Sequence, residues 1–152
     1  MYSFYINSNS DSYVVRMNNR TFLTAIRHRK IFGDRVVFFD SEGVELARVK
    51  QFYFLIINFG FKIDFLGRYK SAKIYKKRLT TFNIEVESDK FSFQYSVFGK
   101  CSELYVNDKP VGSFKIHNEN NSGYLHEIVC NSEKEGLAFC ILDIVEDWFY
   151  FN

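Results

Sequence analysis

Basic residues gather in one part of the sequence, residues 62–78, where their side chains could bind a negatively charged partner. The segment contains one acid, Asp64, and two interleaved tyrosines, Tyr69 and Tyr75. Near an anionic membrane each Lys or Arg contributes about 1 kcal/mol of attraction, and the same groups could contact nucleic-acid phosphates. The alternative is a solvated hairpin whose lysines protect edge strands from aggregation. The candidate anion- or lipid-binding residues are Lys62, Arg68, Lys70, Lys73, Lys76, Lys77 and Arg78.

A second, shorter basic run is Arg27-His28-Arg29-Lys30, with Arg35 close by in the sequence. The run follows a predicted strand, so we expect it to lie in a loop, either as a solvated turn or as a second anion-binding patch. The net charge of the whole chain is only +2, which does not indicate a nucleic-acid-binding protein. The expected partner is therefore an anionic phospholipid or another protein, and no nucleic acid.

Histidine and cysteine residues offer little for metal binding or catalysis. His117 and His126 flank a predicted turn, residues 118–123, and could meet across a hairpin, but Cys130 is the one nearby candidate for a further zinc ligand. His126 with Cys130 or Cys101 could in principle form a base–nucleophile pair, yet no catalytic motif accompanies them. Cys101, Cys130 and Cys140 lie in apolar or strand-like stretches, which favours reduced, buried thiols. The sequence therefore indicates a protein that is not an enzyme and uses no metal or cofactor.

Asp143 interrupts an apolar stretch, residues 137–145. If this stretch is buried, the carboxylate must be paired or protonated, because an unpaired buried charge is very costly. We expect a structural hydrogen bond or ion pair, with an Arg or Lys on a strand as the partner. The alternative is a functional acid that faces a cavity.

Most of the elements that must position these residues are short strands. Apolar and polar residues alternate with a period of two in 80–86 and in 91–98, which is typical of a strand with one wet face. Turn signals at residues 40–43 and 107–110 predict hairpins. Residues 21–27 fit a strand or a helix, and we expect a strand. The expected strands are 1–6, 13–17, 21–27, 35–39, 44–50, 51–65, 71–77, 80–86, 91–98, 104–106, 111–116 and 124–130.

The pattern changes after residue 131. Ser132 and Glu135 form an S-x-x-E capping box, and the residues that follow are apolar almost all round, which is typical of a buried helix. A buried strand over 139–145 is the alternative, but the cap and the length favour a helix of about residues 133–149. A sheet of ten to twelve strands must close to remove its edges. We therefore predict a mainly β, single domain over residues 1–152: a closed antiparallel barrel around the apolar C-terminal helix.

Two hairpins, residues 38–49 and 105–116, and the terminal segment 138–147 occur in the order described above. In these segments the chain resembles the tubby C-terminal-like superfamily, and within it the small LURP-one-related, phospholipid-scramblase-like members. The resemblance covers most of the chain by order of elements and about a third of it by motif. It implies a twelve-stranded barrel around a helix and a non-enzymatic role, such as phosphoinositide or membrane-surface binding. The family's phosphoinositide-binding motif has no counterpart here, so the resemblance assigns no lipid-binding residue.

The expected function is that of a non-enzymatic, tubby-like binding or interaction module that contacts anionic lipid headgroups at a membrane surface. The aromatic content of 19% leaves a second function open, a small β-barrel carrier of an apolar ligand of the lipocalin or fatty-acid-binding type. Such a carrier needs an empty interior. The longest apolar run, residues 52–61, is far shorter than the roughly 20 residues of a transmembrane helix, and no signal-peptide pattern occurs. We therefore expect a cytoplasmic protein that could attach peripherally to a membrane.

Overall fold

The computed structural model describes residues 1–30, 33–54, 57–66, 72–78, 81–95, 101–120 and 123–150. Within these ranges the chain forms twelve strands, which are followed by one helix, α1 (Glu133–Tyr150). The strands are β1 (Tyr2–Asn9), β2 (Ser12–Met17), β3 (Arg20–His28), β4 (Arg35–Asp40), β5 (Glu45–Phe54), β6 (Ile57–Phe65), β7 (Ala72–Arg78), β8 (Thr81–Val86), β9 (Asp89–Tyr95), β10 (Cys101–Val106), β11 (Lys109–Asn120) and β12 (Gly123–Cys130).

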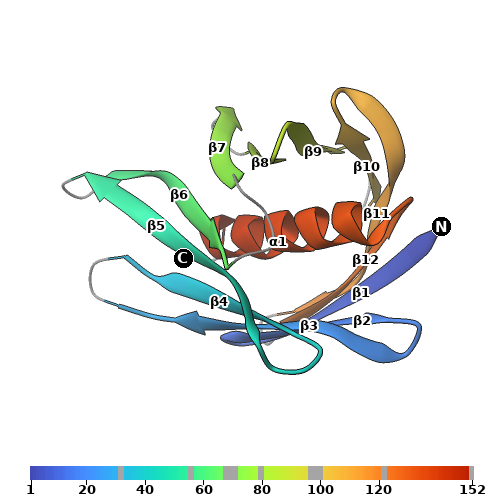
Figure 1. The fold of residues 1–152 in the computed structure, drawn as a ribbon, viewed down its shortest axis with the longest axis horizontal. Coiled ribbons are helices and arrows are strands. Elements are labelled where there is room, and N and C mark those ends of the chain that lie inside the picture. The colour runs from blue at the N-terminus through green and yellow to red at the C-terminus, as the bar shows by residue number, and fades with distance from the viewer. Residues whose placement is uncertain are drawn as a thin grey trace.

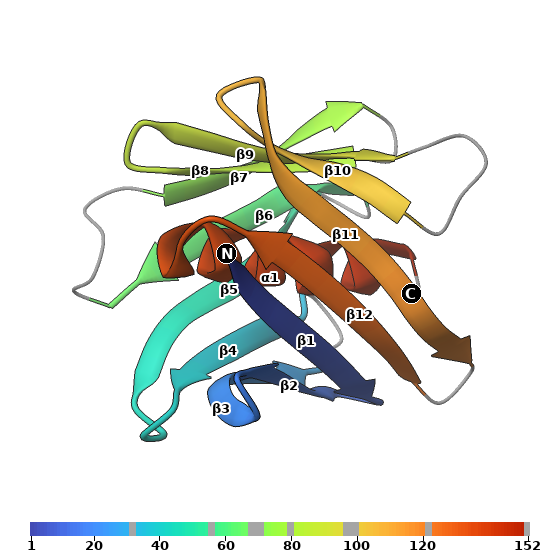
Figure 2. The same ribbon diagram turned by 90° about the vertical axis from the view of Figure 1, so that its right-hand side faces the viewer.

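The strands form one closed antiparallel barrel. Each strand pairs with the next one in sequence, and β1 also pairs with β12, so that the sheet closes on itself. Figures 1 and 2 show the strands curving around α1. Closure removes the edge strands whose unpaired backbone groups could bind another chain. The predicted fold class, a mainly β barrel around a C-terminal helix, is confirmed.

Tight turns set the register of several hairpins. At the β10–β11 turn, Asn107 and Asp108 have φ angles of 51° and 64°, and at the β2–β3 turn Asn18 and Asn19 have φ angles of 52° and 60°. Positive φ at both central residues is the mark of a type I′ turn, whose twist matches that of the flanking strands. Asn and Asp adopt this conformation more readily than other residues that carry a side chain. The hairpin predicted around residues 107–110 is confirmed.

Several sequence-based predictions were wrong in their boundaries, and three of them bear on the residues discussed below. Residues 51–65, predicted as one strand, divide between β5 and β6, which pair with each other. The basic run 27–30, predicted in a loop, begins inside β3, where Arg27 is buried and its Nη2 lies 2.6 Å from Oδ2 of Asp34. The predicted turn 118–123 is shorter, because β11 continues to Asn120. In each case pairing with another segment overrides the local polarity of the sequence.

The helix α1 begins at the predicted cap. The Ser132 Oγ accepts a hydrogen bond from the backbone N–H of Glu135 at 3.2 Å, and Glu135 Oε2 accepts one from the N–H of Asn131 at 2.8 Å. Residues 136–146 are buried without interruption, about three turns, so every side of the helix is covered. The helix thus runs through the interior of the barrel (Figure 1). In the part of the chain that the structure describes, no helix is long and apolar enough to cross a membrane.

Inward-facing strand residues pack directly on α1. The Phe139 ring lies edge-on to Phe91, with ring centroids 5.5 Å apart, and is tilted against Phe93 at 5.8 Å. Ile141 and Ile144 are fully buried in the same core. The helix therefore occupies the space that a lipocalin-type barrel leaves for its ligand, which speaks against a carrier with its ligand in the barrel interior.

Gly136 allows the first turn of α1 to approach β1 closely. A Cβ atom at this position would overlap the ring of Phe4, which is fully buried. Alanine normally stabilises a helix by about 1 kcal/mol relative to glycine. Here it must displace a packed ring, and overpacking of a core costs about 1–3 kcal/mol.

We therefore expect Gly136→Ala to lower the free energy of unfolding by about 1 kcal/mol or more, measured by urea titration. In a protein that already carries Phe4→Leu, adding Gly136→Ala should lower the free energy of unfolding by less, because the smaller leucine leaves room for the methyl group. Glu133→Ala, in the same helical turn but exposed, is the control. An alanine variant that is more stable than the wild type would contradict the close contact.

Candidate functional site

The strand register brings basic residues from four neighbouring strands into one row on the barrel. Lys50 of β5 pairs with Arg35 of β4 on one side and with Lys62 of β6 on the other. The pairing of Phe61 with Ile74 places Lys73 of β7 opposite Lys62. We call these four residues the basic row: Arg35, Lys50, Lys62 and Lys73.

The basic row faces away from the core. Its neighbours along the strands, Val49, Ile63 and Ile74, are all buried, and successive residues of a strand point to opposite faces. The side chains of Lys62 and Lys73 are 72% and 64% exposed. Lys50, Lys62 and Lys73 are therefore exposed on the outer surface of the barrel, whereas Arg35 faces outward but is half-buried, with a buried Nε atom.

The electrostatics of the basic row are unfavourable for the isolated protein. Like charges directly opposite each other on neighbouring strands destabilise a sheet, and Lys50 lies directly opposite Lys62. Neighbouring acids compensate only in part: the Lys62 Nζ is 3.8 Å from Asp64 and the Lys73 Nζ is 3.5 Å from Glu85. Such solvent-exposed pairs contribute at most about 1 kcal/mol each. Such a row of cations could attract an anionic partner.

An aromatic side chain lies beside the row. The Lys73 Nζ is 5.8 Å from the centre of the Tyr75 ring, within the range of a cation–π interaction. Tyrosine combines an apolar ring with a polar hydroxyl, and such side chains favour interfaces that are apolar on one side and wet on the other.

The structure brings together only part of the predicted basic segment 62–78. Lys62 and Lys73 lie next to each other in the basic row. Arg68 and Lys70 lie outside the described residues. Lys76, Lys77 and Arg78 belong to β7, where only their backbone is described.

Two members of the basic row were missed as part of this site. Arg35 was assigned to the separate run 27–30, and Lys50 was not singled out at all. Both lie on a hairpin whose turn, residues 40–43, was predicted correctly. Extending the register outward from that turn would still not have paired Arg35 with Lys50, because a β-bulge beside Phe38 and Phe39 shifts the pairing by one residue.

The second basic run does not form a patch of its own. Arg27 is buried against Asp34, and Arg29 pairs with Asp11 at 2.7 Å on the surface. His28 pairs with Arg35 in the register of β3 and β4, so it lies at the end of the basic row. The run 27–30 therefore extends the basic row by His28 and does not form a second site.

Asp143 is buried and paired, but with a histidine instead of the expected Arg or Lys. The Nδ1 atom of His126, on β12, lies 3.1 Å from both carboxylate oxygens, and the two side chains are only 7% and 5% exposed. The ring of Tyr124 stacks on His126, with centroids 3.8 Å apart. This geometry holds α1 against β12 within the packed core.

Two further carboxylates of α1 bind other strands. The Tyr13 hydroxyl of β2 donates a hydrogen bond to Oδ2 of Asp147 at 3.0 Å, and the Phe82 N–H of β8 donates one to Oε1 of Glu146 at 3.4 Å. Burial raises the pKa of Glu146 to about 8 and that of Asp147 to about 6. Three acidic residues thus tie the helix to three different strands.

His117 and His126 lie on neighbouring strands but do not meet. His126 points into the core, whereas His117 lies outside, where its Nε2 is 2.7 Å from Glu127. Cys130 and Cys140 are free, buried thiols, and burial raises the pKa of both, as expected for unreactive cysteines. Among the side chains that the structure describes, no cluster of His, Cys, Asp and Glu could hold a metal ion.

Comparisons with protein-family models, with curated proteins and with solved structures find no match to this chain. The tubby-like resemblance stays a prediction. The structure shows that the protein is a small closed β-barrel. Because a fold does not by itself define a function, the function must be argued from the surfaces of the barrel.

The buried pair gives a first test of the interior. Asp143→Leu should lower the free energy of unfolding by about 3–5 kcal/mol, because it removes one partner of a buried pair and leaves His126 buried without this carboxylate. The double variant Asp143→Leu with His126→Phe should recover most of this loss, since replacing both partners by apolar groups is often close to neutral. Urea unfolding at pH 7 measures both, with Asp64→Leu as an exposed control. A single variant as stable as the wild type would show that the pair does not stabilise the fold.

The carboxyl group of Glu146 gives a second test. Its pKa of about 8 in the folded protein lies above the usual value, so the folded state binds this proton more tightly than the unfolded state. The free energy of unfolding should therefore fall as the pH rises from about 5 to about 8. Glu146→Gln should flatten this decline and be more stable than the wild type at pH 8, whereas the exposed Glu42→Gln should leave it unchanged. Parallel pH profiles of wild type and Glu146→Gln would contradict a protonated, buried Glu146.

Proposed function

We propose that this protein is a non-enzymatic, tubby-like binding module that attaches to anionic phospholipid surfaces through the outer face of β4–β7. The observation that carries the proposal is the basic row. Its cations repel one another in the free protein, and anionic headgroups above the row would relieve that repulsion. A cytoplasmic protein that binds peripherally to membranes fits this proposal.

The shape of the site supports a lipid surface as the partner. The row runs across the outer wall of a barrel, from strand to strand, so its cations could contact an extended anionic surface together. Each basic residue near such a surface contributes about 1 kcal/mol of attraction, so the row supplies a few kcal/mol. Tyr75 beside Lys73 adds a side chain suited to the interfacial region. The resemblance to tubby-like proteins suggests the same class of partner.

The experiment compares two variants that lose the same charge. The test variant carries Lys50→Gln, Lys62→Gln and Lys73→Gln. The control variant carries Arg16→Gln, Lys109→Gln and Lys115→Gln, three exposed residues on β2 and β11, strands that carry no member of the basic row. Both are compared with the wild type by co-sedimentation with phosphatidylcholine vesicles, with and without phosphatidylserine, over a series of salt concentrations.

We expect the wild type to bind only the vesicles that contain phosphatidylserine, and less as the salt concentration rises. The test variant should lose affinity on the order of a hundredfold, since three basic residues contribute about 1 kcal/mol each. The control variant should bind nearly as well as the wild type. The test variant should also melt no lower than the wild type, because it loses like-charge repulsion. Equal losses in both variants would assign binding to net charge alone, and no binding by the wild type would refute the proposal.

A further inference from the structure

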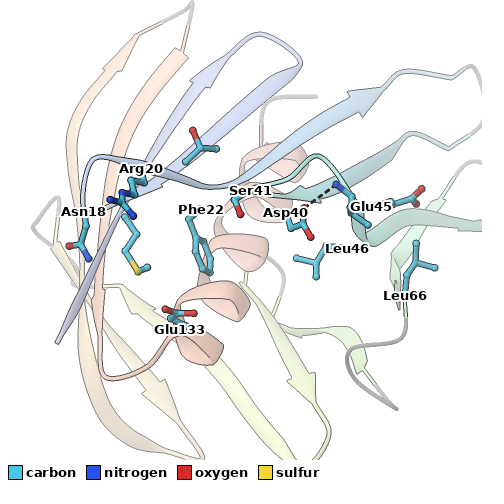
Figure 3. Close-up of a pocket in the computed structure, with 12 residues that line it drawn as sticks. Asn18, Arg20, Phe22, Asp40, Ser41, Glu45, Leu46, Leu66 and Glu133 are labelled. Carbon is cyan, nitrogen blue, oxygen red and sulfur yellow. Dashed lines mark hydrogen bonds between the residues drawn. The ribbon is translucent and has the colours of Figure 1, made fainter.

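A cavity of about 930 Å³ opens beside the first turn of α1, at one end of the barrel. Its walls come from the β2–β3 turn, the β4–β5 hairpin and Leu66, the residue that follows β6 (Figure 3). The cavity shares no residue with the basic row. Its volume falls within the range of small-molecule sites, roughly 300–1,000 Å³.

The floor of the cavity is apolar. Phe22 lies near its centre in Figure 3, and Met17 and Leu46 line it as well. All three pack against the hydrophobic core, which fixes their positions. At the rim, Val44 and Leu66 are 59% and 53% exposed, although both are apolar. A ligand with an apolar body would cover these side chains and remove their surface from water.

The charges around this floor are mainly negative. Asp40, Glu45 and Glu133 line the cavity against a single Arg20, whereas the chain as a whole carries a net charge of +2. Glu45 is neutralised by Arg48, with Oε1 2.6 Å from Nη2.

Among the described residues, the other two carboxylates form no ion pair with a basic side chain. Asp40 uses Oδ1 to accept the backbone N–H groups of Glu42 and Val44, both at 2.9 Å, so the turn holds this carboxylate in place. Glu133 is exposed in the first turn of α1, where Glu133 and Glu135 offset the positive end of the helix dipole.

We propose that this cavity binds an amphipathic organic cation, a small molecule with an apolar body and an ammonium group. The apolar body would lie on Phe22 and Leu46, and the ammonium group would lie between the carboxylates of Asp40 and Glu133, which flank Phe22 in Figure 3. An anionic amphiphile would face both carboxylates at close range. A neutral one would desolvate them without supplying a partner, which is costly.

The test uses three probes of equal chain length: octylammonium, octanoate and octanol. Each is titrated at pH 7 into the full-length ¹⁵N-labelled protein, and binding is followed through the amide signals. Octylammonium should produce saturable shifts in residues 17–22 and 40–46, next to the cavity, with a higher affinity than octanol and a much higher affinity than octanoate. Equal affinities for octylammonium and octanoate, shifts confined to other parts of the barrel, or no saturable shifts would each overturn the proposal.

Two variants test the charged part and the apolar part of the cavity separately. Glu133→Gln should weaken octylammonium about two- to fivefold, the range of a single exposed ion pair, and leave octanol unchanged. Leu66→Ser should weaken both probes, because it removes apolar surface from the rim. Glu42→Gln, on the same hairpin turn but not lining the cavity, is the matched control and should change neither. An octylammonium affinity that is insensitive to Glu133→Gln and Leu66→Ser would place the ligand elsewhere and refute the assignment.

Discussion

The central helix is the constraint on which the rest of the structure depends. Its residues 136–146 are covered on all sides, so the sheet has to curve around it and close. The helix also carries carboxylates into this interior, where an unpaired charge would cost several kcal/mol. Asp143 meets His126 of β12, and Asp147 meets Tyr13 of β2. Apolar packing alone would allow a helix that is apolar on nearly all sides to rotate about its axis or slide along it. These polar pairs specify how the helix is rotated and how far it extends into the barrel.

The packing around the helix also determines what the outside of the barrel presents. Successive residues of a strand face opposite sides, so burying Val49 and Ile63 turns Lys50 and Lys62 outward, side by side. A shift of the register by one residue would exchange the two sets. The position of the basic row is therefore specified as strictly as the core itself, even though the row does not stabilise the fold. The packed core and the basic row thus lie on the two faces of the same strands.

Local patterns in the sequence predicted most of the fold, and they failed where distant segments decide the outcome. Period-two alternation identified strands such as 80–86, and the capping box at Ser132 identified the start of the helix. The same patterns placed the run 27–30 in a loop after a strand and did not predict the burial of Arg27, because its acidic partner, Asp34, comes later in the chain. They also divided the basic residues into two runs along the sequence, whereas the site joins residues across strands. Register and partner choice are properties of the closed barrel.

The closing seam of the barrel has a consequence for how the chain folds. β1, at the beginning of the barrel, pairs with β12, and α1 enters the interior from the residues that follow β12. Contacts so distant in sequence slow folding, and a partly built sheet exposes both open edges and an unfilled apolar lumen. A nascent chain cannot complete its core until residues 133–150 have left the ribosome. We therefore expect the barrel to assemble late and in one cooperative step, with chaperones protecting the unfinished sheet until the helix arrives.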